Sequence, residues 1–379
     1  MFKKILKGLG GLLFTLVILA LVVYVASGPE RPAADSASAS WVEDGPYSVG
    51  VTEINFVDDT RPTAENRGIA GASDRTLHSW IWYPEDSEED LPLIIHSHGI
   101  MSQGNELVNV AERLASHGYV VAAANFPLTN GGTTGGANAN DVVNQPADVS
   151  FLIDSVLTLS GDEKPFTGAI DTDRIGLSGY SLGGLTTVLA TYHPRWREPR
   201  VNAALSIAGP INAFTPQFYT NSNVPFLGIN GTADALIDYA TNGLIIPDRI
   251  GNSSLLTIDG GSHLGFISMA DPTFRFMHNP DTIGCQGVLS VLEDGTDDVF
   301  AAFGSETDGV LLDPSAPAVC ANLPPQEAAH PGRQKMILEI AVLAFFESVF
   351  GETETIRNTA REQLENSIAA DFEEASFVD

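Results

Sequence analysis

The chain has 379 residues, of which 44% are hydrophobic, so it is long enough to bury a substantial core as one large α/β domain or two small ones. Its 48 acidic residues outnumber 19 basic residues and give a formal net charge of −29. A surface this acidic repels nucleic-acid phosphates and anionic lipid headgroups, which argues against nucleic acid as a partner.

The first 27 residues differ from the rest of the chain in being basic at the start and then uncharged and apolar. Three lysines precede residues 8–26, a run of nineteen residues without a charge. As a helix this run would be about 28 Å long, close to the hydrocarbon thickness of a bilayer. A secretory signal usually has a shorter apolar core, although Val25-Ala26-Ser27 would serve as a cleavage site. We expect residues 1–27 to be a membrane anchor, the favoured reading, or a signal peptide, with the remainder exported.

The rest of the sequence divides by composition. Residues 28–45 are rich in Ala, Ser, Pro and Asp, which predicts a flexible linker. Residues 46–351 have the features of one folded domain, interrupted at 266–330 by a loop-rich insertion with many prolines, glycines and acidic residues. Residues 352–379 predict an acidic C-terminal helix and tail.

Short β-rich runs alternate with helix-length segments along the folded domain. The first two runs predict an antiparallel hairpin, and 119–124 is a continuous apolar run, typical of a parallel strand covered on both faces. The alternation predicts an α/β fold with a mostly parallel central sheet and helices on both faces. The glycine-rich stretch 127–140 is expected to form a flexible loop at the rim. We expect strands at 49–57, 76–83, 93–97, 119–124, 174–177, 203–207, 225–229 and 255–258, and helices at 106–117, 142–159 and 335–349.

The motif Gly179-Tyr180-Ser181-Leu182-Gly183 lies between an apolar strand-like run and a helix-like run. This context favours a nucleophile elbow, a strained strand-to-helix turn that exposes a serine, over an ordinary Gly/Ser turn. The small residues are needed because the strand and helix backbones approach closely there. Ser181 is therefore the candidate nucleophile.

A serine hydroxyl becomes a useful nucleophile only when a base removes its proton and an acid orients that base. In this architecture the partners follow in the order Asp, then His. Asp234 comes just after the predicted strand at 225–229, with Asp238 as an alternative acid. His263 follows the last predicted strand in a glycine-containing loop and is the candidate base.

Attack on an ester carbonyl creates an oxyanion that needs two fixed N–H donors. We expect one to be the backbone N–H of Leu182, at the start of the elbow helix. The second should come from the loop after the strand at 93–97, with Ile100 favoured and Met101 as the fallback. His96 and His98 stand at the entry of this loop, where we expect them to shape the turn by hydrogen bonds rather than bind a metal, because no third ligand is apparent.

The two cysteines of the chain, Cys285 and Cys320, both lie in the insertion. An exported protein folds in an oxidising compartment, so we expect them to form a disulfide that closes a loop of about 35 residues. Neither has a neighbour at metal-ligand spacing, and no metal site is expected.

These segments together resemble the α/β-hydrolase superfamily, in particular its dienelactone-hydrolase-like and platelet-activating-factor-acetylhydrolase-like branch. The resemblance implies an α/β-hydrolase fold, with Ser181, Asp234 and His263 in the triad positions and Ile100 and Leu182 in the oxyanion positions. It covers roughly residues 75–265 and the final helix, and is carried by residues 93–100, 114–121, 170–184, 230–234 and 261–263.

Dienelactone hydrolases proper use a cysteine nucleophile, so Ser181 indicates ester cleavage instead, a layout that bacterial cutinase-like polyester hydrolases share. We expect an exported serine esterase that acts on a small-molecule or polymeric ester through an acyl-enzyme, with no metal or organic cofactor. Two alternatives stay open. One is a prolyl-oligopeptidase-like serine peptidase, although residues 28–75 cannot hold the propeller that such enzymes usually carry. The other is a non-catalytic, membrane-tethered binding module.

Overall fold

The chain divides into two compact units, Met1–Arg31 and Pro32–Asp379. In the first unit, residues 14–19 and 21–26 are helical, while residues 1–13 and 20 of the predicted anchor or signal lie outside the described residues. No helix within the described part of the chain has both the length and the apolar character to cross a bilayer. The membrane anchor therefore stays a prediction. The computed structural model describes residues 14–19, 21–159, 164–292 and 301–379.

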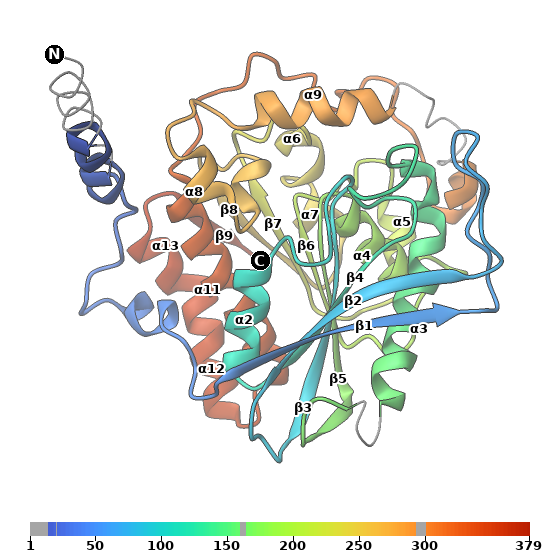
Figure 1. Ribbon diagram of the computed structural model, residues 1–379, viewed down its shortest axis with the longest axis horizontal. Coiled ribbons are helices and arrows are strands. Elements are labelled where there is room, and N and C mark those ends of the chain that lie inside the picture. Colours follow the sequence, from blue (N-terminus) through green and yellow to red (C-terminus); the bar gives the residue numbers. More distant parts are fainter. Residues whose placement is uncertain (1–13, 20, 160–163, 293–300) are drawn as a thin grey trace, which may run out of the picture. The chain divides into compact units, whose positions relative to one another are not determined.

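The second unit is built on a nine-stranded sheet within the described residues, in the order β1-β2-β4-β3-β5-β6-β7-β8-β9 (Figure 1). The first two strands form the predicted antiparallel hairpin, and β2 also pairs antiparallel with β4. From β4 through β8 all neighbouring strands are parallel, which confirms the predicted mostly parallel sheet. The strands are β1 Val49–Asp58, β2 Arg75–Pro84, β3 Asp90–Ser97, β4 Val120–Asn125, β5 Ala169–Tyr180, β6 Ala203–Ile207, β7 Phe226–Gly231, β8 Ser253–Ile258 and β9 Ala375–Val378.

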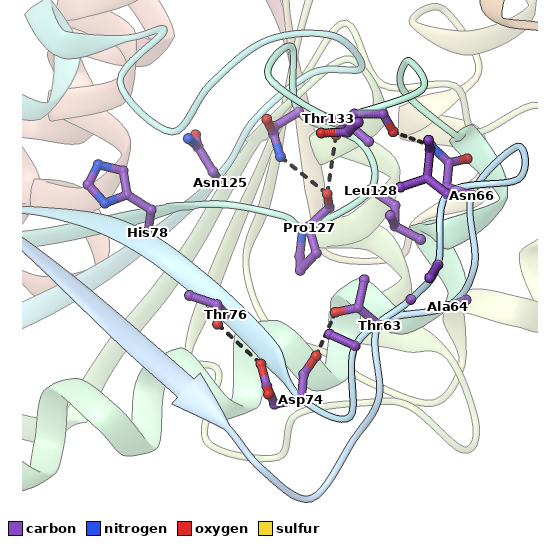
Figure 2. Close-up of a pocket in the computed structure, with 16 residues that line it drawn as sticks. Thr63, Ala64, Asn66, Asp74, Thr76, His78, Asn125, Pro127, Leu128 and Thr133 are labelled. Atoms are coloured by element: carbon purple, nitrogen blue, oxygen red, sulfur yellow. Dashed lines mark hydrogen bonds between the residues drawn. The ribbon is translucent and has the colours of Figure 1, made fainter.

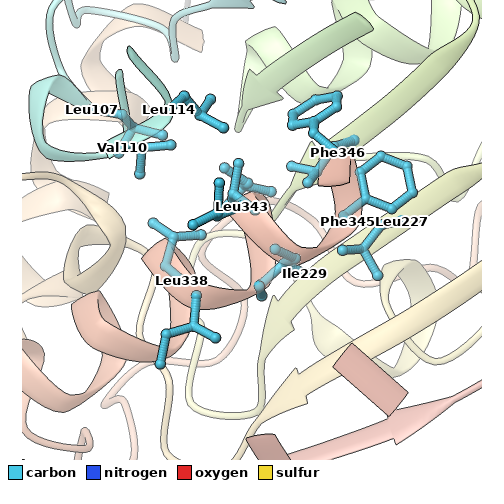
Figure 3. Packing of buried hydrophobic residues seen from close by; sticks show 14 of the residues in the cluster. Leu107, Val110, Leu114, Leu227, Ile229, Leu338, Leu343, Phe345 and Phe346 are labelled. Carbon is cyan, nitrogen blue, oxygen red and sulfur yellow. The ribbon is translucent and has the colours of Figure 1, made fainter. Parts of the chain in front are cut away.

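Helices cover both faces of this sheet because its central strands carry apolar side chains on both sides. On one face, α3 (Gln145–Thr158) and α4 (Leu182–Tyr192) pack on a cluster that includes Leu93 and Ile95. On the other, α2 (Val108–Ser116) and α11 (Pro331–Phe350) pack on a cluster that includes Ile94. Figure 3 shows this second cluster, where Leu338, Leu343 and Phe346 of α11 meet α2 and the strands.

The predicted flexible linker is partly folded onto the second unit, contrary to expectation. A short 3-10 helix, η1 (Ala37–Val42), brings Trp41 and Val42 onto the same apolar cluster as α11. Ser38 is fully buried; its N–H donates to Asp371 at 2.8 Å and its hydroxyl accepts from Gln363 at 2.7 Å. Residues 28–45 are mostly small and polar, so their average composition predicts a linker even though a few apolar residues among them pack on the core.

The C-terminal segment contains the predicted surface helix and an additional strand. Helix α12 (Glu354–Glu362) is followed by a π-helical turn, η6 (Gln363–Ser367), and by α13 (Ile368–Asp371). The chain then ends in β9, which pairs antiparallel with β8. Phe377 also packs on the core. The pairing with β8 and this packing stabilise the four-residue strand, and both depend on distant residues. The acidic sequence around the strand therefore does not predict it.

The insertion at 266–330 is more helical than predicted in its described residues. The 3-10 helix η4 (Leu264–Phe266) leads into it, and it contains α8 (Ala270–Phe274), α9 (Asp281–Leu292) and η5 (Glu306–Asp308). Cys285 and Cys320 form the predicted disulfide, with Cα atoms 5.7 Å apart. Both are buried and pack with Ala235, Leu236 and Ile237. The disulfide therefore ties the insertion to the loop after β7.

Candidate active site

Ser181 stands on the predicted elbow, between the end of β5 and the start of α4. Its backbone adopts φ 54° and ψ −118°, a conformation that a non-glycine residue keeps only when its surroundings enforce it. The Ser181 N–H donates to the Ile207 carbonyl at 2.8 Å, and the Ser181 carbonyl accepts from Leu185 at 3.2 Å. These bonds hold the strained turn from both sides.

The two motif glycines are required by close backbone approach. A Cβ atom at Gly179 would lie on the carbonyl oxygen of Gly183, and one at Gly183 would lie on the carbonyl oxygen of Ser97. The elbow is therefore packed against the end of β3 as well as against its own helix. The same end of β3 leads into the loop that was predicted to supply an oxyanion donor.

The structure brings together the three residues predicted as a triad. His263 Nε2 lies 2.9 Å from Ser181 Oγ, and His263 Nδ1 lies 2.7 Å from Asp234 Oδ2. All three side chains are buried, with residue exposures of 7% for Ser181, 4% for Asp234 and 2% for His263. Asp234 and His263 follow the ends of the adjacent parallel strands β7 and β8, which is where side chains converge in open α/β sheets.

The alternative acid, Asp238, has a different role. Its carboxylate caps the short helix α6 (Tyr239–Asn242) by accepting from the Thr241 N–H and hydroxyl at 2.9 and 2.8 Å. Asp234 uses its second oxygen, Oδ1, to accept from the N–H groups of Leu236 and Ile237 at 2.9 and 2.8 Å. These bonds fix the carboxylate so that Oδ2 faces the imidazole.

The environment of His263 favours its charged form. Burial alone lowers the pKa of the imidazole, but the adjacent Asp234 carboxylate and, more weakly, Asp281 and Glu106 raise that pKa above its usual 6.5. The ring packs against Tyr180 in a tilted arrangement with centroids 4.9 Å apart, and the Tyr180 hydroxyl donates to the His263 carbonyl at 2.9 Å. The imidazole is thus held in one orientation by contacts on several sides.

The loop after β3 lies directly beside Ser181. A Cβ atom at Gly99 would approach the Cβ of Ser181 to 3.2 Å. The Met101 N–H donates to the Thr129 carbonyl at 2.8 Å, so it is engaged elsewhere and the fallback oxyanion donor is wrong. Among the hydrogen bonds between described residues, neither the Ile100 N–H nor the Leu182 N–H donates to a protein acceptor. Both are therefore free for a substrate oxygen.

Two histidines and a glutamate shape this loop. His98 Nε2 accepts from the Phe126 N–H at 3.1 Å, so Nδ1 carries the proton and donates to the Gly99 carbonyl at 2.7 Å. Burial lowers the pKa of His98, consistent with this neutral form. Glu106 accepts from the Gly99 N–H at 2.9 Å and lies 3.3 Å from His96. The predicted turn-shaping role of His96 and His98 agrees with these contacts.

Asp281 contacts both triad loops and was missed by the sequence reasoning. It is fully buried at the first position of α9, and its carboxylate accepts from the N–H groups of Ala235, His263 and Leu264. Burial and the nearby Asp234 raise the pKa of Asp281 to about 6. Asn279-Pro280-Asp281 is a helix-start pattern, but the many prolines and glycines around it predict a loop.

A cavity of about 390 Å³ opens between the β1–β2 connection and the glycine-rich loop 127–140 (Figure 2). Its lining includes Thr63, Asp74, Asn125 and Thr133, and does not include the triad. The glycine-rich loop is nevertheless tied to the loop after β3, because the Gly131 N–H donates to the Ser102 carbonyl at 2.8 Å. The cavity lining mixes hydroxyl and amide side chains with apolar ones such as Ile69 and Leu128.

Comparison with known proteins places this site in a family. A family model described as PET hydrolase-like matches residues 65–277, more than half of the chain. The matched segment contains the elbow serine and both of its partners, but ends before Asp281. No curated protein matches the chain.

Proposed function

Because the chain belongs to the PET hydrolase-like family of ester hydrolases, in the α/β-hydrolase superfamily, we propose that it is an exported serine esterase working through an acyl-enzyme intermediate. The observation that carries the proposal is the hydrogen-bonded chain from Ser181 Oγ through His263 to Asp234. Nucleophile, base and orienting acid are within the distances that proton transfer needs.

In the first half of the reaction, Ser181 Oγ attacks the ester carbonyl carbon while His263 Nε2 takes the hydroxyl proton. The carbonyl oxygen becomes an oxyanion, which accepts hydrogen bonds from the N–H groups of Ile100 and Leu182. When the tetrahedral intermediate collapses, the ester C–O bond breaks. The departing alkoxide receives the proton from His263 and leaves as an alcohol, and the acyl group stays on Ser181.

In the second half, His263 removes a proton from water, and the resulting hydroxide attacks the acyl carbon. Collapse of this second intermediate breaks the bond to Ser181, whose oxygen regains the proton from His263, and the carboxylic acid leaves. Asp234 holds the imidazole in the tautomer whose Nε2 faces Ser181 and stabilises the imidazolium that forms twice per turnover.

The chemistry of the surroundings supports an uncharged or cationic carboxylic ester, small or polymeric, as the substrate. The net charge of −29 disfavours approach of strongly anionic esters. Export is supported by the uncharged run at residues 8–26 behind three lysines and by the disulfide, since disulfides persist in oxidising compartments.

Labelling with a serine-directed fluorophosphonate tests the proposal. The wild type should be labelled at Ser181, and Ser181→Ala should abolish the label while leaving the fold intact. Turnover of p-nitrophenyl esters of increasing acyl length, measured beside a prolyl-peptide substrate, should show ester cleavage and no peptide cleavage. An unlabelled, inactive wild type would support the non-catalytic binding module, and prolyl-peptide cleavage would support the peptidase. N-terminal sequencing of the mature protein distinguishes a cleaved signal, with a start at Gly28, from an anchor.

A further inference from the structure

Asp281 takes no step in the proposed mechanism, yet it is hydrogen-bonded to the loops of two triad residues. It has no measurable exposure, yet it is an acidic side chain at the start of α9. Its Oδ2 accepts from the N–H groups of Ala235 and His263, both at 2.9 Å, and its Oδ1 accepts from Leu264 at 2.8 Å. One carboxylate therefore joins the loop that carries Asp234 to the loop that carries His263.

Asn279 extends this connection to the other side of Asp234. Its Oδ1 accepts from the Asp281 N–H at 2.8 Å, and its Nδ2 donates to the Ala233 carbonyl at 3.0 Å. Asp234 is thus flanked by two bonds to the same short segment, one to the residue before it and one to the residue after it. Asn279 is itself buried, so water does not compete for these bonds.

The disulfide fixes the helix that carries Asp281. Cys285 lies one turn further along α9, and the N–H of its partner Cys320 donates to the Leu236 carbonyl at 3.1 Å. Leu236 belongs to the Asp234 loop, so the covalent link and the Asp281 bonds act on the same loop. Asp281 cannot withdraw from the triad loops without displacing this disulfide-linked helix.

We propose that Asp281 is a positioning residue of the esterase: its carboxylate sets the relative placement of Asp234 and His263 and adds a negative charge that favours the imidazolium. This rests on the proposed function. Burying an ionised carboxylate is costly unless it is hydrogen-bonded, and three backbone N–H groups provide that compensation here. Asp281 lies beyond the segment that the family model matches, so its role is not inherited from that match.

The charge effect is separable from the positioning effect because few charged groups face His263. These are Asp234 on the β7 loop, Asp281 on α9 and Glu106 ahead of α2, and each raises the pKa of His263 against the opposing effect of burial. Tyr180 contacts the ring face and the carbonyl but carries no charge at neutral pH. Removing the Asp281 charge should therefore lower the pKa of His263, because one of three negative neighbours is lost.

The test compares Asp281→Asn, Asp281→Glu and Asn279→Ala with the wild type. The control is Asp271→Asn, which changes an acidic residue of the same insertion that pairs with Arg275. In Asp281→Asn, kcat should fall about 10- to 100-fold because of the misplaced triad, with KM within about twofold of wild type. The acid limb of its kcat/KM profile should also move to lower pH. Asp281→Glu should keep the wild-type limb, and Asn279→Ala should lower kcat without moving the limb.

A wild-type kcat and pH profile in folded Asp281→Asn would overturn the inference. If that variant does not fold, Asn279→Ala decides: an unchanged kcat would overturn the inference, and a fall with an unmoved acid limb would support it. These outcomes differ from failure of the proposed function, which would appear as an inactive wild type that fluorophosphonate does not label.

Discussion

Asp234 Oδ2 lies 2.7 Å from His263 Nδ1, and both side chains are almost fully buried. At this depth, burial and ion pairing act in opposite directions on the imidazole: burial lowers its pKa, and the neighbouring carboxylate raises it. Burial is the largest single effect, but the Asp234 carboxylate together with Asp281 and Glu106 outweighs it, so the pKa of His263 lies above 6.5. This pair therefore sets the pH range in which Nε2 can accept the serine proton.

The first prediction concerns pH dependence. His263 must be neutral to take the proton from Ser181, so kcat/KM should fall as pH decreases through the raised pKa of His263, with a midpoint above pH 6.5. The pH–rate profile of kcat/KM on a non-ionising ester measures this midpoint. His278→Gln, at an exposed histidine of the insertion, should leave the profile unchanged. A midpoint below 6.5 would contradict the raised pKa of His263.

The second prediction separates the two candidate acids. Asp234→Asn should lower kcat by about 10⁴-fold, since it loses the carboxylate that orients His263, and Ser181→Ala or His263→Ala should lower kcat by about 10⁶-fold. Asp238→Asn is the matched control, because the Asp238 carboxylate caps α6 and bonds Asn322. Steady-state kinetics on one ester measures all four variants. A loss in Asp238→Asn as large as in Asp234→Asn would contradict the assignment.

The third prediction tests the elbow backbone. In Gly179→Ala the new methyl group would collide with the Gly183 carbonyl, and in Gly183→Ala with the Ser97 carbonyl. We expect each variant to lose about 1–3 kcal/mol of unfolding free energy and at least about 100-fold in kcat/KM. Gly251→Ala is the control, since a Cβ there meets no atom within 4 Å. Urea unfolding and ester kinetics measure both effects, and wild-type behaviour of Gly179→Ala would rule out the close approach.

Much of this arrangement could be predicted from the sequence because its signals are local. Five consecutive residues, 179–183, predict the elbow, and Asp234 and His263 each lie in a short turn after an apolar strand. The role of Asp281 could not be predicted, because its partners His263 and Ala235 are 18 and 46 residues away in the sequence and only the folded chain brings them together. The docking of Trp41 and the pairing of β9 were missed for the same reason: each depends on a surface formed by distant segments.

The fourth prediction concerns a buried ion cluster that links β2 to α3. Arg75 of β2, with 1% of its surface exposed, binds Asp141 at 2.8 Å and Asp148 at 2.6 Å. In Arg75→Met both carboxylates lose this partner while still buried, and we expect a loss of about 3–5 kcal/mol in unfolding free energy. Arg361→Met, at an exposed arginine, should change it by less than about 1 kcal/mol. Chemical denaturation compares the two, and equal effects would contradict the importance of the cluster.

The fifth prediction follows from the buried carboxyl of Asp281. Its pKa rises from 3.8 to about 6 on folding, with burial as the main cause and Asp234 adding to it. A carboxyl whose pKa is raised by folding stabilises the native state below pH 3.8 relative to higher pH, and this contribution is lost as pH rises through about 6. The rise in pKa corresponds to about 3 kcal/mol.

Asp281→Asn removes this titration, so the difference in unfolding free energy between wild type and variant should change by about 2 kcal/mol between pH 4 and pH 7, in favour of the variant at the higher pH. Urea unfolding of both proteins at several pH values measures it, and a difference that stays constant with pH would show that Asp281 does not titrate in this range. The expected direction means that the native carboxylate lowers stability at the pH where His263 is a base. Such a cost in stability is expected where a buried group supplies geometry and charge to an active site.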